Sequence, residues 1–584
     1  MMMMKMKMKL GYGSLCWVTL LVYLQVAQAD FFTYLEQLQL FLYTKQYATE
    51  TICAVGGLST YVARFVGQFF RLPGVGALVT ASLLTAVILL TQQLLARWTH
   101  RLFYLLPTWP VIGLLYVQFD QAYLPEGTWS YLFMLLALCN LTHYTSRWVR
   151  LGIAVLWQTA LFWACGSVAS LFVGMVLLTE LLRDYKRGAC FLLLPLVAYG
   201  WGQFARYAEW LGQERFIFAP DLYYDPLVQK AELLYAWYAL PLVTLLAGAL
   251  SRWQQKCPAG WMQLVGGWAV ACGLAYLPLQ SLSDRIDFTW DRYLRTGQWE
   301  ELLAAYRPGD TNLQRLNLVN LALAKQGRLA TDFLHYPQNN EGTLLSEWDH
   351  TVENALTLSE IYYQIGDIAS AQKFAFEGNL SSQAGGNPRL LQLLVKTNLI
   401  FGAYPVAQKY LYLLQQTWGY RDWANTWMNY TNDEAVAQHP ELGPKRLGLR
   451  GAGEMAVSGQ LPKVLEQLMR NDPSNPMPVQ YLTTYYLLNV NLKAFLVLKE
   501  AHYGSPAWPN LTVPQQEAMV ALLQKQPTEW VKNGVSLKVE HHFNEFDRDM
   551  NRYHNQMNVK EIMAEHYGAT YWYYLMFNRK KKAQ

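Results

Sequence analysis

The chain has 584 residues, of which 53% are hydrophobic and 15% charged, and its formal net charge is +5. No stripe of lysine and arginine stands out, which argues against nucleic acid as a partner. The length accommodates two or three domains. All seven cysteines lie between Cys16 and Cys272, so a disulfide framework is excluded from the C-terminal half.

The N-terminal half predicts a transmembrane helix bundle at residues 11–280, preceded by a cytoplasmic tail at 1–10. A helix needs about 20 apolar residues to cross roughly 30 Å of hydrocarbon. Spans five and six are separated only by Gly166 and predict a tight helical hairpin or a re-entrant pair. We expect about nine spans, near 11–28, 74–95, 102–118, 128–144, 151–164, 167–183, 188–204, 234–251 and 261–279.

Basic residues predict the sidedness of this bundle, because short loops rich in lysine and arginine stay in the cytoplasm. They occupy every second gap between apolar runs, which places the N-terminus inside and the C-terminal domain in the periplasm of an inner membrane. The first span is either an anchor, which we favour, or a cleavable signal peptide ending at Ala27-Gln28-Ala29. The basic residues are Lys5, Lys7, Lys9, Arg97, Arg101, Arg147, Arg150, Arg183, Lys186, Arg187, Arg252 and Lys256.

Two outer loops, 30–73 and 205–233, are long enough to carry structure. In the first, the amphipathic segments Phe31–Leu42 and Tyr61–Phe70 predict helices lying along the membrane surface. The second is polar and aromatic, so it either binds a substrate at the mouth of the bundle or forms a solvated cap. Its candidate binding residues are Arg206, Arg215, Asp221 and Asp225.

Ionisable residues inside the spans are few, and ion transport is therefore poorly supported. Glu180 and His143 fall near the expected cytoplasmic ends, where they reach water. No cofactor is expected. No metal is expected either, although four histidines crowd the C-terminal region, because they lack a His-Glu-x-x-His pattern and a cysteine partner. These histidines are His541, His542, His554 and His566.

Residues 283–584 predict a soluble array of paired helices with tetratricopeptide-like features. Gly366 and Gly402 each precede an alanine by five residues, at Ala371 and Ala407. A helix ending at glycine, followed by a small residue in the next helix, permits close packing of the pair. Looser copies and the helix boundaries lie at Gly297, Gly327, Gly459, Asn387-Pro388 and Asn475-Pro476. The repeats either bind a partner protein or have only a structural role.

Three stretches resemble a family of uncharacterised polytopic membrane proteins of Gram-negative bacteria. They are Glu36–Phe41 with the segments that follow it up to Phe70, Asn317–Ala324 and Thr397–Tyr404. The resemblance extends over most of the chain. It implies an inner-membrane protein with an external helical-repeat domain. It brings no catalytic residues, because we know of no activity assigned to that family.

The architecture also resembles the GT-C class of membrane glycosyltransferases, in which a first span precedes a long outer loop with a functional carboxylate. That resemblance implies Glu36 or Asp30 as the catalytic base toward a lipid-phosphate-linked sugar. It implies Arg64, Arg206 or Arg215 as phosphate ligands. The paired acids usual after the first span are missing, because Asp30 and Glu36 stand six residues apart.

Two functional hypotheses follow. The first is a non-enzymatic envelope scaffold or assembly protein, held by the lipid bilayer and binding a protein partner through its helical repeats. The alternative is a GT-C-like transferase that uses a polyprenyl-phosphate-linked sugar. Whether the chain is an enzyme stays open at the level of sequence.

Overall fold

A computed structural model describes residues 2–120, 123–184, 188–208, 217–224, 234–252, 282–382, 386–449 and 461–578. These residues form helices and contain no β-strand, which confirms the expected all-α class; their β-type pairing is limited to isolated bridges such as Tyr123–Tyr224 and Ser505–Trp508. The chain divides into two compact units. The first comprises Met1–Thr289 with Gln416–Arg421, and the second Trp290–Gln415 with Asp422–Gln584.

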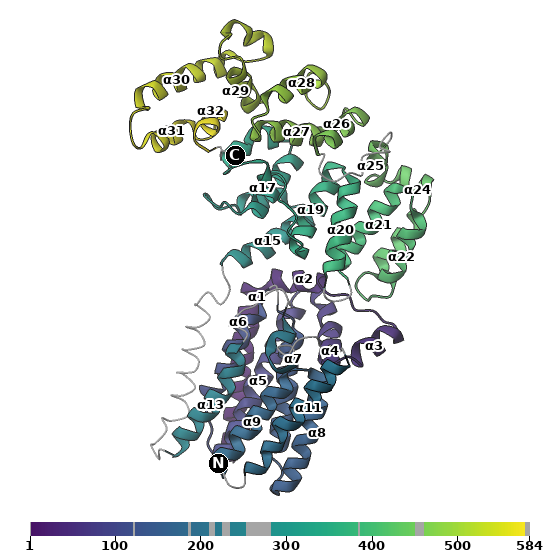
Figure 1. Cartoon of the computed structure of the whole chain (residues 1–584), viewed down its shortest axis with the longest axis vertical. Helices are drawn as coiled ribbons and strands as arrows, with labels where there is room; N and C mark the ends of the chain where they lie inside the picture. The colour runs from purple at the N-terminus through teal and green to yellow at the C-terminus, as the bar shows by residue number, and fades with distance from the viewer. Residues whose placement is uncertain are drawn as a thin grey trace. The chain divides into compact units, whose positions relative to one another are not determined.

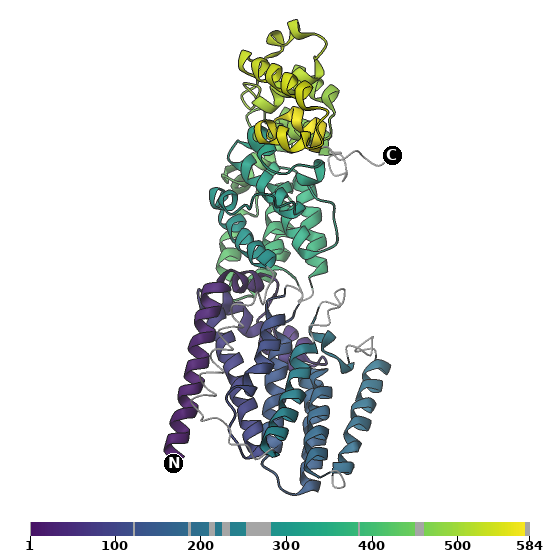
Figure 2. The same cartoon turned by 90° about the vertical axis from the view of Figure 1, so that its left-hand side faces the viewer.

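The first unit is a bundle of apolar helices (Figure 1). The helix α5 packs against α1 and α7, while α8 contacts α7, α9 and α11, and α13 packs on α6. Figure 2 shows α1 in purple along one edge of this unit. The helices are α1 (Met2–Ala27), α2 (Ala29–Gln37), α3 (Lys45–Ile52), α4 (Gly57–Gly67), η1 (Gln68–Arg71), α5 (Val75–Thr99), η2 (Leu106–Thr108), α6 (Trp109–Gln118), α7 (Glu126–Leu141), α8 (Arg147–Cys165), α9 (Val168–Arg183), η3 (Ala189–Leu192), α11 (Leu193–Tyr207), η4 (Pro220–Tyr223) and α13 (Tyr235–Arg252).

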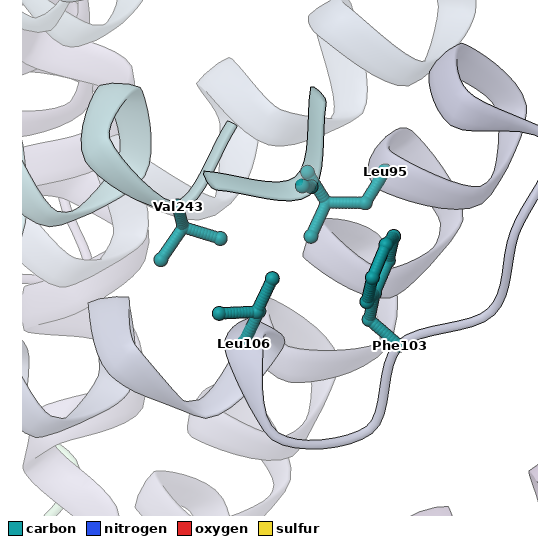
Figure 3. Close-up of a cluster of buried hydrophobic side chains, with 5 residues drawn as sticks. Leu95, Phe103, Leu106 and Val243 are labelled. Carbon is teal, nitrogen blue, oxygen red and sulfur yellow. The ribbon is translucent and has the colours of Figure 1, made fainter. Parts of the chain in front are cut away.

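Close helix packing in this bundle depends on small residues and apolar clusters. A Cβ added at Gly113 of α6 would lie 2.7 Å from the backbone nitrogen of Ala236 on α13, so only glycine allows this approach. Leu95, Phe103, Leu106 and Val243 form a buried cluster that joins α5, η2 and α13 (Figure 3). Gly166, with φ 79°, separates α8 from α9, and the two helices pack on each other, as expected of a tight helical pair at this position.

The expectation of about nine membrane spans is corrected. Among the described residues, two helices are long and apolar enough to cross a membrane, α5 and α8, or three if α1 and α2 count as one span bent by 74°. The spans expected at 102–118, 128–144, 167–183 and 188–204 correspond to helices of 10, 16, 16 and 15 residues, each shorter than the roughly 20 that a crossing needs. The expected span at 261–279 lies outside the described residues.

The α2 part of Phe31–Leu42, the segment expected to lie along the membrane surface, packs on other parts of the first unit. This part buries Phe31, Phe32 and Leu35. The Phe31 ring meets Phe119 and Phe288 at centroid distances of 5.1 Å each. These contacts with protein account for the buried face of α2, and its position at a membrane surface stays a prediction.

The second unit consists of shorter helices that pack mainly on their neighbours in sequence, as α19 with α20 and α21 with α22 (Figure 1). The helices are α15 (Leu282–Thr296, which begins in the first unit), α16 (Trp299–Ala304), α17 (Leu313–Lys325), α18 (Leu329–Asp332), η6 (Phe333–His335), η7 (Glu341–Thr343), α19 (Val352–Ile365), α20 (Ile368–Ser381), α21 (Pro388–Phe401), α22 (Tyr404–Gln415), α23 (Arg421–Trp427), η8 (Met428–Tyr430), α24 (Asp433–Gln438), α25 (Leu442–Gly448), α26 (Leu461–Asn471), α27 (Pro476–Leu488), α28 (Leu492–His502), α29 (Val513–Leu522), η9 (Pro527–Glu529), η10 (Val531–Asn533), α30 (Leu537–Tyr553), α31 (Val559–Tyr567), α32 (Tyr571–Tyr573) and η11 (Tyr574–Asn578).

Local signals predicted in this half are present. Gly297, Gly327, Gly366 and Gly402 follow the ends of helices with φ 68°, 74°, 105° and 76°, a conformation that favours glycine. The small residues that follow the last two, Ala371 and Ala407, are fully buried. The helix boundaries expected at Asn387 and Asn475 are present, and both are helix starts, since the side-chain oxygens of these residues accept backbone N–H groups of α21 and α27. Gly459 lies outside the described residues.

Candidate functional site

One end of the first unit gathers arginines that bind the carbonyl ends of helices. Arg97 of α5 donates to the Cys139 carbonyl of α7 at 3.0 Å, and Arg252 of α13 donates to the Leu182 carbonyl of α9 at 3.0 Å. Arg150 pairs with Glu180. A cation at a helix C-terminus is favoured by the helix dipole. Glu180 therefore has an ion-pair partner at this end.

The opposite end holds Glu36, the carboxylate predicted as a catalytic base. Glu36 is only 5% exposed, and its Oε2 accepts a hydrogen bond from the Tyr420 hydroxyl at 2.8 Å. The Arg71 guanidinium lies 5.0 Å from the Tyr420 ring centroid and donates to the Gly419 carbonyl. Glu36 and Arg71 thus hold one short segment of the protein in place.

That segment is Gln416–Arg421, which belongs to the first unit although the sequence places it more than 370 residues after Glu36. The Gln416 carbonyl accepts the Tyr43 N–H at 2.8 Å, and the Trp418 ring packs on Phe69 at 5.1 Å. A Cβ added at Gly419 would lie 3.7 Å from Glu36 Oε1. Sequence reasoning missed this contact, because no periodic pattern connects two loops so far apart.

Asp30 and Arg64, the other residues predicted at this end, contact separate partners. Asp30 lies in the first turn of α2, where a negative charge is favoured, and its Oδ2 accepts the Thr289 hydroxyl at 2.9 Å. Arg64 on α4 forms an ion pair with Glu126, the first residue of α7, at 3.5 Å between Nε and Oε1. Glu126 is 4% exposed and was not singled out from the sequence. Its only signal is an acid placed directly before an apolar run.

The second predicted loop is partly described. Arg206 is exposed in the last turn of α11, and Asp221 is partly exposed in η4, whereas Arg215 and Asp225 lie outside the described residues. Tyr223 anchors η4 to the bundle, since its hydroxyl donates to the Cys165 carbonyl and accepts the Val168 N–H. Glu36, Arg64 and Arg206 therefore have different structural surroundings, and their joint role in a site stays a prediction.

The second unit contains a cluster of charged and aromatic side chains from α19, α21, the end of α23 and the start of α25. The Glu441 carboxylate accepts the Tyr363 hydroxyl at 2.6 Å and the Lys396 ammonium at 2.9 Å. The Lys445 ammonium lies 4.5 Å from the Tyr363 ring centroid and donates to the Tyr363 carbonyl at 2.5 Å. Lys396 also lies over the Tyr363 and Trp427 rings, at 5.5 and 5.3 Å. We call these five residues the Tyr363 cluster.

Charge in the Tyr363 cluster is unevenly compensated. Burial raises the pKa of Glu441, but the Lys396 and Lys445 ammonium groups and the Tyr363 hydroxyl outweigh it, so the pKa lies below its usual value. Burial, followed by repulsion from the Lys325 ammonium, lowers the pKa of Lys445 to about 8. Sequence reasoning missed this cluster, because its residues come from four helices and have no motif spacing.

A cavity of about 590 Å³ lies between α21, α24 and α25. Arg446 lines it, pairs with Asp433 and donates to the Tyr404 hydroxyl at 2.9 Å. Among the histidines noted in the sequence, His541 approaches Glu545 at 3.6 Å. The described residues contain no group of three or more histidine, cysteine, aspartate or glutamate side chains arranged to hold a metal ion.

These features define an all-α protein with an apolar helix bundle and a second unit of shorter helices. The chain belongs to a family described as Family of unknown function (DUF6057), whose model matches residues 5–578. No curated protein and no solved structure matched it.

Proposed function

We propose that this protein is an envelope scaffold or assembly protein, anchored in the bacterial inner membrane by its first unit. The exposed apolar surface of that unit supports the anchor. Soluble proteins seldom leave large apolar side chains exposed on neighbouring helices, and such a surface marks contact with lipid or protein. Exposed side chains of this kind include Val22 on α1, Leu156 on α8, Leu196 and Tyr199 on α11, and Leu242 on α13.

The distribution of arginine supports the orientation. Arg97, Arg150 and Arg252 gather with Glu180 at one end of the first unit, the arginine end. Arg64 and Arg71 lie at the other end with Asp30, Glu36 and Glu126, so these acids outnumber the arginines there and we call it the acidic end. By the positive-inside rule, the arginine end is cytoplasmic and the acidic end periplasmic. Alkaline phosphatase fused after Ser283 should be active, and the same fusion after Arg187 inactive; the reverse pattern would refute this orientation.

Partner binding is proposed for the second unit, and the successive helix pairs carry this proposal. The pairs α19–α20 and α21–α22 are each joined at a left-handed glycine, and α20 also packs on α21. Tetratricopeptide-like pairs stacked in this way bury a continuous core between neighbours and leave a face that commonly binds peptides or proteins.

The test is crosslinking with mass spectrometry in native membranes. A scaffold should yield one reproducible partner whose crosslinks map to α17–α25. The Gly378→Leu variant should lose these crosslinks. A Cβ at Gly378 of α20 would lie 2.4 Å from the Ala355 Cβ of α19 and would push the two helices apart. Crosslinks no stronger than background in the native protein would refute the proposal.

A second candidate function is a GT-C-like transferase. It is favoured by the bend of 74° between α1 and α2, which places Asp30 and Glu36 directly after the first apolar helix. Glu36→Gln keeps the acceptor for the Tyr420 hydroxyl but removes the charge. A transferase should lose its activity or cellular phenotype in this variant at unchanged expression. A scaffold should tolerate the change.

A further inference from the structure

The Lys445 ammonium lies over the Tyr363 ring in the Tyr363 cluster. Among the described residues, no carboxylate lies within 4.0 Å of the Lys445 ammonium, whereas Lys396 beside it is neutralised by Glu441. Lys445 donates a hydrogen bond to the Tyr363 carbonyl, near the C-terminal end of α19. An ammonium has three donor hydrogens, so this carbonyl satisfies one of them.

A purely structural role accounts for only part of this arrangement. A lysine that caps a helix C-terminus needs a carbonyl and the helix dipole, and Lys445 has both. Capping does not require a second ammonium on the same aromatic ring, yet Lys396 also lies over Tyr363. Two like charges on one ring repel each other, and Lys325 adds to that repulsion at Lys445. The Glu441 and Glu360 carboxylates attract Lys445, so two carboxylates face the three ammonium groups of Lys325, Lys396 and Lys445, and one positive charge is left for another anion.

The cluster itself indicates which anion fits. Glu441 shows that a carboxylate oxygen in this position accepts both a lysine ammonium and the Tyr363 hydroxyl. A second carboxylate could accept the remaining hydrogens of the partly exposed Lys445. A charge-assisted hydrogen bond of this kind is worth more than a neutral one.

We propose that Lys445, with Lys396 beside it, binds a carboxylate of a partner polypeptide on the face formed by α19, α21 and α25. This inference rests on the proposed partner-binding function and specifies its chemistry. The ligand carboxylate comes either from an acidic side chain or from the terminal carboxylate of the partner. Both sources offer the same group to Lys445, so the experiment must separate them.

The experiment measures fluorescence anisotropy of labelled peptides with the full-length protein in nanodiscs. One peptide alternates glutamate and alanine and has an amidated C-terminus. A second replaces glutamate with glutamine and has a free C-terminal carboxylate, and a third combines glutamine with the amidated end. We expect one of the first two to bind and the third not to bind. The arm that binds identifies the source of the carboxylate.

Substitutions then assign the site. Lys445→Met should weaken binding about tenfold or more, and Lys445→Arg should restore most of it, because the charge and donors return. Lys396→Met supplies a second variant should Lys445→Met fail to fold. Lys499→Met is the matched control, since Lys499 also lies over a tyrosine ring, 5.7 Å from that of Tyr503, outside the cluster.

Three outcomes would overturn the inference. The first is that neither carboxylate peptide binds. The second is that Lys445→Met, Lys396→Met and the native protein bind the peptide equally well. The third is that inorganic phosphate displaces the peptide whereas acetate at the same ionic strength does not. A native partner whose crosslinks persist in Lys445→Met would refute the inference and leave the proposed function intact. Absence of any partner for the native protein would refute the proposed function instead.

Discussion

At the joint between α27 and α28, Val490 adopts φ 56°, a left-handed conformation that is costly for a β-branched residue. The corresponding joints after α17, α19 and α21 have glycine at this conformation. The Val490→Gly variant should therefore raise the free energy of unfolding of the second unit by about 1 kcal/mol, since relief of strain exceeds the added entropy of the unfolded state.

Denaturant unfolding of the full-length protein, followed by circular dichroism, measures this effect. The control is Val497→Gly, which makes the same change at an exposed position inside α28. That variant should be neutral or slightly destabilised, because glycine is the poorer helix former. A loss of stability in Val490→Gly would contradict the strain argument.

The buried carboxyl of Glu517 predicts a pH dependence of stability. Glu517 is 1% exposed and accepts the Tyr571 N–H at 2.7 Å, and burial raises its pKa from 4.5 to about 8. Between these values the unfolded protein releases the proton that the folded protein keeps. Stability should therefore fall as pH rises through this window, by about 1.4 kcal/mol per pH unit at most.

The Glu517→Gln variant removes this proton linkage while keeping an oxygen acceptor for Tyr571. It should be more stable than the native protein near pH 8 and change less between about pH 5 and pH 8. Thermal unfolding at the two pH values measures the difference, with the exposed Glu500→Gln as control. An unchanged pH profile in Glu517→Gln would show that Glu517 is ionised in the folded protein.

At the scale of the element, α17 is held to the loop that follows it by buried amides. The Asn317 Nδ2 donates to the Gly342 and Thr343 carbonyls at 2.8 Å each, and its Oδ1 accepts the Ser346 N–H at 2.9 Å. Asn320 donates to the same Thr343 carbonyl at 2.8 Å. These amides order a connection with little regular structure of its own.

Asn317→Leu should consequently destabilise the second unit by about 2–3 kcal/mol, because buried carbonyls and an N–H lose their partner. The matched control is Asn398→Leu on α21, a buried asparagine whose Nδ2 bonds to the Leu394 carbonyl of its own helix. The control should cost less than about 1 kcal/mol. The denaturant midpoints of both variants measure the difference. A midpoint for Asn317→Leu as high as that for Asn398→Leu would show that the hydrogen bonds of Asn317 do not stabilise the second unit.

Sequence reasoning succeeded at elements whose signals are local. The helix starts at Asn387 and Asn475 and the turn at Gly366 depend on residues within one turn of each other, so spacing alone predicts them. It did not predict the protein contacts of α2, because an amphipathic helix that packs on Phe119 and Phe288 has the same pattern as one that lies on lipid. The stretch that begins at Asn317 contributed to the family resemblance, but the sequence did not predict the hydrogen bonds that the Asn317 side chain makes.

At the scale of the whole molecule, apolar runs predict a bundle more reliably than they predict how many helices cross a membrane. The hydropathy of an apolar residue is the same whether the residue faces lipid or another helix. In α7, for example, Met134, Leu135 and Leu138 are buried inside the unit. Contacts distant in sequence, such as Glu36 with Tyr420, cannot be obtained from one sequence by periodicity. The candidate sites depend on such contacts, and they were accordingly the least predictable part.

The orientation of the first unit yields a prediction for the intact cell. Cys53 is exposed at the C-terminal end of α3, on the end proposed to be periplasmic, whereas Trp148 is 62% exposed beside Arg147 at the opposite end. A membrane-impermeant maleimide should label Cys53 once the outer membrane is opened, and Cys53→Ser should abolish this signal. In the Cys53→Ser background, Trp148→Cys should be labelled only after the inner membrane is permeabilised, because the proposed orientation places a thiol at the arginine end in the cytoplasm. Labelling of Trp148→Cys in cells with an intact inner membrane, together with protection of Cys53, would invert the orientation and with it the side on which a partner is sought.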